Sequence, residues 1–217
     1  MTDKPKVKKK KKRAEHDFYP TPEWCTTRFV ESFDISGTYF LEPCVGNGAI
    51  IKALSKHNKT MSWHANDIPE QQINFEKHLS EIDSISSVTW KSFLDLKRTD
   101  VINQPDMIIT NPPFSIAFDI IKHAMKEFGT NHICMLLRLN FLGSAERSAF
   151  FRENMPDVYV LPNRPSFDGE GSDTIEYAWF VWTKKDNESY ACPKGTLVLL
   201  ADTDKAQRKR EKPSKIA

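Results

Sequence analysis

The chain lacks the features that mark several large protein classes. No continuous apolar run approaches the roughly 18 residues of a membrane span, and the polybasic N-terminus has no apolar segment of the kind found in signal peptides. The six histidines have no partner at the spacing of a nucleophile or a metal ligand. The cysteines are also scattered, with no short paired spacing: Cys25, Cys44, Cys134 and Cys192. We therefore expect a cytoplasmic protein with reduced thiols, no metal and no membrane association.

A formal net charge of +2 conceals an uneven distribution of charge along the chain. Residues 1–13 carry a net +7 and residues 204–217 a net +4, which leaves −9 for the part between them. Blocks of like charge are usually disordered and often bind polyanions. We expect a disordered basic arm over 1–15 and a disordered basic tail over 204–217. These serve either as solubilising termini or as tethers to nucleic acid through counterion release.

The part between the tails, residues 16–203, is long enough for one sizeable domain. Within it, strand-like apolar runs alternate with amphipathic helical stretches. The predicted strands are 39–42, 62–67, 87–90, 107–110, 133–138, 158–162 and 177–183. The predicted helices are 25–33, 49–56, 69–82, 116–128 and 145–154.

This alternation predicts an α/β domain with a mainly parallel seven-stranded sheet and helices on both faces. The last two predicted strands are joined by a polar stretch and are expected to form an antiparallel hairpin at the C-terminal edge. Ligands of doubly wound sheets bind beyond the carboxyl ends of the strands. Motifs at those ends are therefore the candidates for a functional site.

A glycine motif, LEPCVGNG, follows the first predicted strand and precedes a helix. Gly46 and Gly48 let a ligand approach the backbone, while the helix N-terminus supplies free N–H groups. The third glycine of a dinucleotide fingerprint is replaced by Ile51, which disfavours a pyrophosphate. Glu42, immediately before the turn, suits a cationic or amino-bearing ligand instead.

Asp67 ends the second predicted strand, about 20 residues after the glycines, as in nucleotide-binding sheets. A carboxylate at this spacing can accept both hydroxyls of an adenosine ribose. It can also cap the helix that begins near Pro69. Together with the glycine motif, this spacing favours an adenosine-containing cofactor.

The fourth predicted strand ends in NPPF, a rigid and donor-poor turn. It presents the side-chain oxygen of Asn111 and the backbone carbonyl of Pro112, and the prolines fix the backbone φ angles and lack N–H groups. Two acceptors that hold the hydrogens of an aromatic amine, such as N6 of adenine, localise its lone pair and make the nitrogen a nucleophile. Phe114 is placed to stack on the base.

The ordered motifs DFYPTP, LEPCVGNG, AND and NPPF resemble the S-adenosylmethionine-dependent N6-adenine DNA methyltransferases, and in compactness the small phage-type enzymes. The stretch RPSFDGEGSDTIEYAWFVW is similar to the closing hairpin of that group. The resemblance implies a Rossmann-like domain, S-adenosylmethionine as cofactor, DNA as partner and a phage-encoded protein acting in a bacterial host.

The same resemblance assigns roles to individual residues. It implies that the catalytic group is Asn111, Pro112, Pro113 and Phe114. It implies that the cofactor lies along Tyr19, Pro20 and Thr21, in a cradle of Glu42, Pro43, Gly46 and Gly48, with Asp67 and Ile68 at its ribose and adenine. Relatives commonly carry Asp-Phe-Leu after the third strand, and here Ser92 and Phe93 occupy the first two of those places, while Asp95 is a possible substitute for the acid. Asn111 also belongs to the implied cofactor site.

No separate recognition domain fits in the chain, so base recognition falls to the loops 140–146 and 163–176. They are helped by arginines that can equally be solvated: Arg138, Arg147, Arg152 and Arg164. Other acceptors with the same motif are RNA amino groups and a protein glutamine amide. A non-catalytic nucleic-acid-binding module and, more distantly, an NAD-dependent oxidoreductase are the alternatives from other classes.

Overall fold

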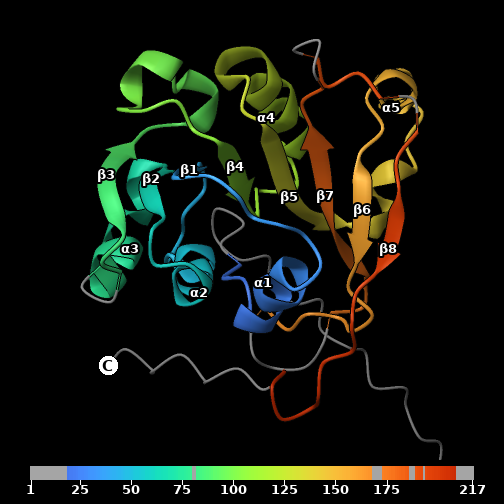
Figure 1. Ribbon diagram of the computed structural model, residues 1–217, viewed down its shortest axis with the longest axis horizontal. Coiled ribbons are helices and arrows are strands. Elements are labelled where there is room, and N and C mark those ends of the chain that lie inside the picture. The colour runs from blue at the N-terminus through green and yellow to red at the C-terminus, as the bar shows by residue number, and fades with distance from the viewer. Residues whose placement is uncertain (1–18, 80–81, 168–172, 186–188, 193, 209–217) are drawn as a thin grey trace, which may run out of the picture.

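The computed structural model of the chain describes residues 19–79, 82–167, 173–185, 189–192 and 194–208. In them an eight-stranded sheet runs in the order β3-β2-β1-β4-β5-β7-β6-β8 (Figure 1). The strands are β1 Tyr39–Glu42, β2 Ser62–Asp67, β3 Ile85–Trp90, β4 Met107–Thr110, β5 His132–Arg138, β6 Asp157–Val160, β7 Tyr177–Thr183 and β8 Leu197–Leu199. The first five strands pair in parallel, and β7 is antiparallel to both β5 and β6.

The predicted class is confirmed, but the predicted number of seven strands is wrong. The additional strand, β8, pairs in parallel with β6 and forms the outer edge of the sheet. Its three residues include Leu197 and Leu199, which are both 69% exposed. The sequence therefore has no pattern of buried apolar residues that predicts this strand. The antiparallel pair β6 and β7 is present, but β7 lies inside the sheet between β5 and β6 rather than at its edge.

Helices cover both faces of the sheet. They are α1 Glu23–Val30, α2 Ala49–His57, α3 Gln72–Leu79, α4 Ala117–His123 and α5 Ser148–Glu153. A π-helical turn, Ala124–Phe128, extends α4, and 3-10 turns occupy Pro69–Gln71, Phe93–Asp95, Arg98–Asp100 and Leu139–Leu142. Among the described residues, none of the helices has the length and apolar character required to cross a membrane.

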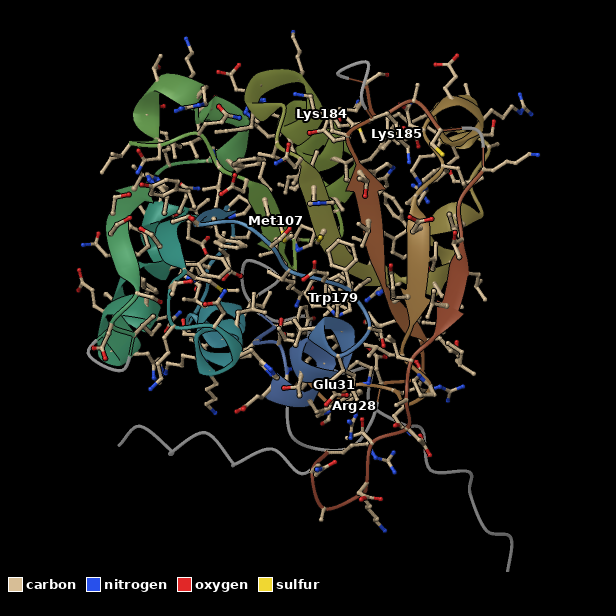
Figure 2. All side chains as sticks on the ribbon, in the orientation of Figure 1. Arg28, Glu31, Met107, Trp179, Lys184 and Lys185 are labelled. Carbon is tan, nitrogen blue, oxygen red and sulfur yellow. The ribbon has the colours of Figure 1, made fainter. Side chains whose placement is uncertain are left out.

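Two apolar clusters fill the space between the sheet and its helices. Because side chains alternate along a strand, Met107 and Ile109 point into the cluster under α1 and α2, whereas Ile108 points into the cluster under α4. Burial on both faces explains why β4 is an uninterrupted apolar run. The indole of Trp179 on β7 stacks on Phe29 of α1, with ring centroids 4.8 Å apart, and Figure 2 shows Trp179 beside this helix.

The starts of β1 and β4 are joined by a carboxylate. Asp106 Oδ2 accepts the backbone N–H groups of Thr38 and Tyr39 at 2.7 and 3.0 Å. Gly37, just before them, has a φ of 124°, and a Cβ there would lie 2.6 Å from the Asp106 Cβ. A side chain at position 37 would therefore push this carboxylate away.

The sequence order of the strands reverses between β1 and β4, since the chain winds outward from β1 to β3 and then returns to the other side of β1. Such a switch point leaves a crevice beyond the carboxyl ends of the two strands. The glycine motif follows β1 and NPPF follows β4, so the fold brings the two motifs to this crevice.

Candidate active site

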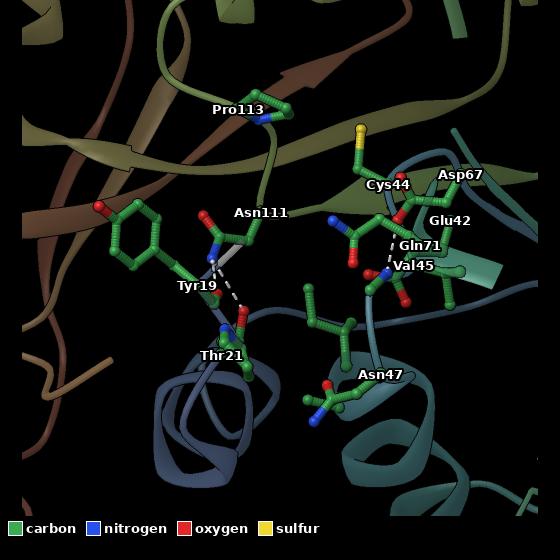
Figure 3. Close-up of a pocket in the computed structure, with 14 residues that line it drawn as sticks. Tyr19, Thr21, Glu42, Cys44, Val45, Asn47, Asp67, Gln71, Asn111 and Pro113 are labelled. Atoms are coloured by element: carbon green, nitrogen blue, oxygen red, sulfur yellow. Dashed lines mark hydrogen bonds between the residues drawn. The ribbon is translucent and has the colours of Figure 1, made fainter. Parts of the chain in front are cut away.

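A cleft open to solvent, with about 470 Å³ of space, lies at the carboxyl ends of β1, β2 and β4 (Figure 3). The predicted site residues that line it are Tyr19, Pro20, Thr21, Glu42, Gly46, Asp67, Asn111 and Pro113. Segments that are far apart in the sequence therefore form one cleft, as the motifs indicate. The remaining lining residues were not predicted as site residues: Cys44, Val45, Asn47, Ala49, Ile50 and Gln71.

The glycine turn forms one wall of the cleft and leads into α2. Gly46 and Gly48 have φ angles of 53° and 74°, in the left-handed region where a side chain is strained. At Gly48 a Cβ would also lie 2.4 Å from the Ile82 Cδ1. Gly48 thus serves packing beneath the turn and does not line the cleft, whereas Gly46 does.

The turn is supported from below by a buried amide on β2. Asn66 Nδ2 donates to the carbonyls of Pro43 and Lys91 at 3.0 and 3.1 Å, and its Oδ1 accepts the Thr89 hydroxyl at 2.7 Å. His64 Nε2 contacts the same hydroxyl at 3.0 Å. This network joins the segments that follow β1 and β3. Pro43 therefore helps to hold the turn in place, because its carbonyl accepts the hydrogen bond from Asn66.

Asp67 fixes the turn from the neighbouring strand. Its Oδ2 accepts the Gly46 N–H at 2.7 Å, and its Oδ1 accepts the Ile68 N–H at 2.8 Å. Burial raises the pKa of this carboxyl to about 6, and the two backbone hydrogen bonds partly offset that rise. Each oxygen keeps a further lone pair, so the carboxylate can still accept ligand hydroxyls.

Glu42 lies deeper than Asp67 and is only 1% exposed. Burial, and then the charge of Asp67, raise the pKa of its carboxyl well above the usual value, while a hydrogen bond from the Ile51 N–H lowers it. Its Oε2 has no hydrogen-bond partner within the described residues. A buried carboxyl oxygen without a partner beside a second acid favours a ligand that carries positive charge or N–H donors.

Asn111 has a defined amide orientation. Its nitrogen donates to the Tyr19 carbonyl and to the Thr21 Oγ1, each at 3.1 Å (Figure 3). A carbonyl oxygen can only accept, so the atom that faces Tyr19 must be the amide nitrogen. The Oδ1 atom is buried and has no partner in the described part of the chain. The amide therefore presents an unused acceptor beside the cleft.

The remaining residues of NPPF have different environments. Pro113 lines the cleft, and its carbonyl accepts the Ile116 N–H at 3.2 Å as α4 begins. Pro112 is buried, and Phe114 is half-buried. Phe114 does not line the cleft, because its ring packs near Tyr177, with centroids 5.8 Å apart, and lies under the Arg138 guanidinium.

Three other predicted cofactor residues lie outside the cleft lining: Ile68, Ser92 and Phe93. Phe93 begins a 3-10 turn that directs its ring into the core, where it stacks on Phe128 with centroids 5.4 Å apart. Ser92 precedes this turn, and Asp95, the possible substitute for the missing acid, is exposed at its end. Gln71, in the 3-10 turn that follows β2, is 5% exposed and lines the cleft.

Three of the four arginines considered for recognition, Arg138, Arg147 and Arg164, make contacts within the protein. Arg147 donates from Nε to the Phe141 carbonyl at 3.0 Å, and its guanidinium lies 4.2 Å from the centre of the Phe141 ring. Arg164 forms an ion pair with Glu176. Part of the loop 163–176 and the whole basic arm lie outside the described residues.

The first part of the predicted basic tail is described, and it packs near α1. Residues 205–208 form a turn, in which the Arg208 N–H donates to the Asp204 carbonyl at 3.1 Å. Arg28 donates to Thr203 Oγ1 and Gln207 Oε1 at 3.0 and 3.1 Å, and also pairs with Glu31 (Figure 2). In the described ranges no group of three or more His, Cys, Asp or Glu side chains is arranged to hold a metal ion.

No family model matches the sequence, and no curated protein matches it. Its fold is similar to that of solved methyltransferases. The methyltransferase subunit of a type I restriction-modification system from Streptococcus thermophilus gives a TM-score of 0.56 at 17% identity, over 77% of this chain and 44% of that one. The 23S rRNA methyltransferase ErmE gives 0.56 at 14%, over 78% and 70%. A dimethyladenosine transferase from Plasmodium falciparum gives 0.55 at 15%, over 79% and 64%.

The chain therefore spans less than half of the length of the first of these proteins and 64% of the third. The similarity extends over more than three quarters of this chain. The chain has the Rossmann-like fold of these methyltransferases.

Proposed function

We propose that the chain is an S-adenosylmethionine-dependent methyltransferase that methylates the N6 amino group of adenine in DNA. The observation that carries this proposal is the Asn111 amide, whose nitrogen is held by Tyr19 and Thr21 while its buried oxygen is left without a partner. A buried acceptor without a partner costs about 1–3 kcal/mol. A substrate amine that donates to this oxygen would recover that cost.

The cleft fits an adenosine cofactor with a cationic centre. Asp67 would accept the ribose hydroxyls, and Glu42 lies where a positive charge would lower its raised pKa and favour the carboxylate. The left-handed turn at Gly46, without a side chain, would let a bound ligand approach the backbone. When bound, S-adenosylmethionine supplies an electrophilic methyl group.

The chain's own part in the reaction is to activate and orient the acceptor. The Asn111 oxygen would accept one hydrogen of the amine, and the carbonyl of Pro112 would accept the other. Holding both hydrogens localises the nitrogen lone pair without a strong base. An oxygen whose orientation is already fixed loses no further freedom when the substrate binds, which is the condition for electrostatic stabilisation by preorganised groups.

The charge distribution and the similar structures support a nucleic-acid acceptor. The net charge of −9 on residues 14–203 disfavours the binding of a polyanion. The two basic ends together carry a net charge of +11 and can bind one. The similar structures include a methyltransferase subunit of a restriction-modification system and a dimethyladenosine transferase. These observations support a nucleic-acid adenine as acceptor, with RNA as the second candidate because ErmE acts on 23S rRNA.

Labelled S-adenosylmethionine tests the proposal. The purified chain is incubated with mixed-sequence duplex DNA, single-stranded DNA and RNA, and the labelled nucleosides are identified by mass spectrometry. We expect N6-methyladenine in DNA. Cofactor binding without transfer to any DNA would exclude DNA as the substrate, and transfer to RNA alone would select the second candidate.

The Asn111→Ala variant tests the role of the amide. Removing a preorganised acceptor is expected to lower kcat by about 100-fold or more, since such groups contribute about 3–4 kcal/mol to transition-state stabilisation. Cofactor affinity measured by calorimetry should change little. Asn103→Ala, at the opposite end of the sheet, is the matched control and should retain full activity. An active Asn111→Ala variant would remove the amide from the mechanism.

A further inference from the structure

Phe114 carries a cation on its ring. The Arg138 guanidinium lies 4.6 Å from the centre of the ring, within the range of a cation–π contact. The guanidinium is planar, so it covers an aromatic face in much the same way as a nucleobase would. The ring expected to stack on the target base does not line the cleft, although its neighbours Asn111 and Pro113 do, and the Arg138 guanidinium occupies the space over it.

Among the described residues, the contacts that hold Arg138 in this position are weak. Its Nε donates to the Tyr177 hydroxyl at 3.4 Å, near the limit for a hydrogen bond, and that hydroxyl donates in turn to Asp173 at 2.7 Å. Within the described residues Arg138 forms no ion pair, in contrast to Arg164, which pairs with Glu176. Arg138 therefore combines a covered aromatic face with a charge that is still available to an anion.

We propose that Arg138 is a displaceable cover on Phe114 that makes the enzyme selective for nucleotides within a polynucleotide over free nucleosides. When a polynucleotide binds, a backbone phosphate draws the guanidinium off the ring, and the target base takes its place. This inference rests on the proposed function, because it assumes that an adenine stacks on Phe114.

The free energies of the contacts allow a polynucleotide to displace Arg138 from Phe114 but disfavour the same displacement by adenosine. The free energy of stacking a base on an aromatic ring is similar to that of stacking a guanidinium on the same ring. Stacking alone therefore does not displace the arginine. A phosphate adds a charge-assisted and frequently bidentate contact to the guanidinium. Adenosine has no phosphate and must displace the cation without compensation.

The Arg138→Ala variant is expected to have opposite effects on the two kinds of ligand. Its affinity for adenosine should rise about fivefold, because the ring is uncovered, and methyl transfer to adenosine at low concentration should rise by the same factor. Its affinity for a mixed-sequence adenine-containing duplex should fall about fivefold, and the dependence of log Kd on log salt should become less steep by about one phosphate contact. Arg138→Lys should keep the salt dependence and gain affinity for adenosine, because an ammonium lacks the planar face.

Arg147→Ala is the matched control. Its guanidinium also lies on a phenylalanine ring, that of Phe141, but this ring is not part of NPPF. We expect no gain for adenosine in this variant. An equal gain in both variants would show a general effect of lost charge, and a loss or no change for both ligands in Arg138→Ala would overturn the proposal.

The binding measurements separate this inference from the proposed function. They use calorimetry and salt titration of the full chain and do not require turnover. If the wild-type chain binds the duplex and transfers no methyl group, the proposed function fails, while the opposite shifts for adenosine and duplex still decide the role of Arg138.

Discussion

Replacement of Thr21 by valine tests how the Asn111 amide is held. Thr21 is 7% exposed, and valine has nearly the same shape but no hydroxyl. The amide nitrogen loses one of its two acceptors and keeps the Tyr19 carbonyl. The variant therefore asks how much of the orientation depends on a side chain and how much on the backbone.

The expected effect on orientation follows from hydrogen bonds of about 1 kcal/mol each. In the wild type a flipped amide loses the bond to the Tyr19 carbonyl, whereas the Thr21 hydroxyl can donate to the amide oxygen instead, so the Tyr19 carbonyl favours the observed orientation by about 1 kcal/mol, or about 84% of the population. With valine the Tyr19 carbonyl remains, so this preference should be nearly unchanged. At saturating cofactor, kcat should therefore fall by less than twofold, far less than in Asn111→Ala.

The stability of Thr21→Val should fall by about 1–2 kcal/mol, because one buried amide hydrogen is left without an acceptor. A double-mutant cycle isolates this contribution. Denaturant unfolding should show that valine costs about 1–2 kcal/mol when Asn111 is present and nothing when residue 111 is alanine. Thr21→Ser, which keeps the hydroxyl and loses a methyl group, should cost the same in both backgrounds. A tenfold loss of kcat in Thr21→Val, or a coupling energy of zero, would refute the proposed anchoring of the amide.

Two further changes test the carboxyl pair and the start of the sheet. Glu42→Gln should make the protein more stable than the wild type, and the difference should grow as pH rises from 5 to 8. A group with a raised folded-state pKa stabilises the fold below its unfolded pKa and loses this contribution as pH increases, whereas glutamine does not ionise. Denaturant unfolding at both pH values measures this, and a constant difference would contradict the raised pKa of Glu42. Gly37→Ala should lower the free energy of unfolding by about 1–3 kcal/mol, through its positive φ and the clash with Asp106. Gly143→Ala, where a Cβ meets its nearest atom at 3.7 Å, should change it by less than 1 kcal/mol, and equal effects at both glycines would argue against the strain at Gly37.

Strands with strong local patterns could be predicted to the residue. The bounds of β1, β2, β4 and β7 agree with the sequence-based prediction. Three of these strands, β1, β4 and β7, are distinct runs of mostly apolar or β-branched residues between turn residues, whereas β2 is largely polar. The predicted helix 116–128 is present, but its last five residues form a π-helical turn. The predicted helix 69–82 begins as a 3-10 turn at Pro69 and reaches Leu79.

The motifs predicted which residues meet at the cleft, but long-range geometry decided their roles. The bond from Asn111 to Thr21 joins residues 90 positions apart, and no local pattern indicates it. The sequence predicts Thr21 along the cofactor, and its contact with the Asn111 amide is apparent only in the structure. Phe93 was expected near the cofactor because of its place after β3, yet the 3-10 turn places its ring in the core.

One of the two anchors of Asn111 is a main-chain oxygen, and this has a consequence for how the protein can diverge. The Tyr19 carbonyl is present whatever residue occupies that position. Substitutions at position 19 can therefore reshape the neighbouring wall of the cleft, and with it ligand preference, while the Asn111 amide keeps its partner. Position 21 lacks this freedom, because there the anchor is the side chain itself.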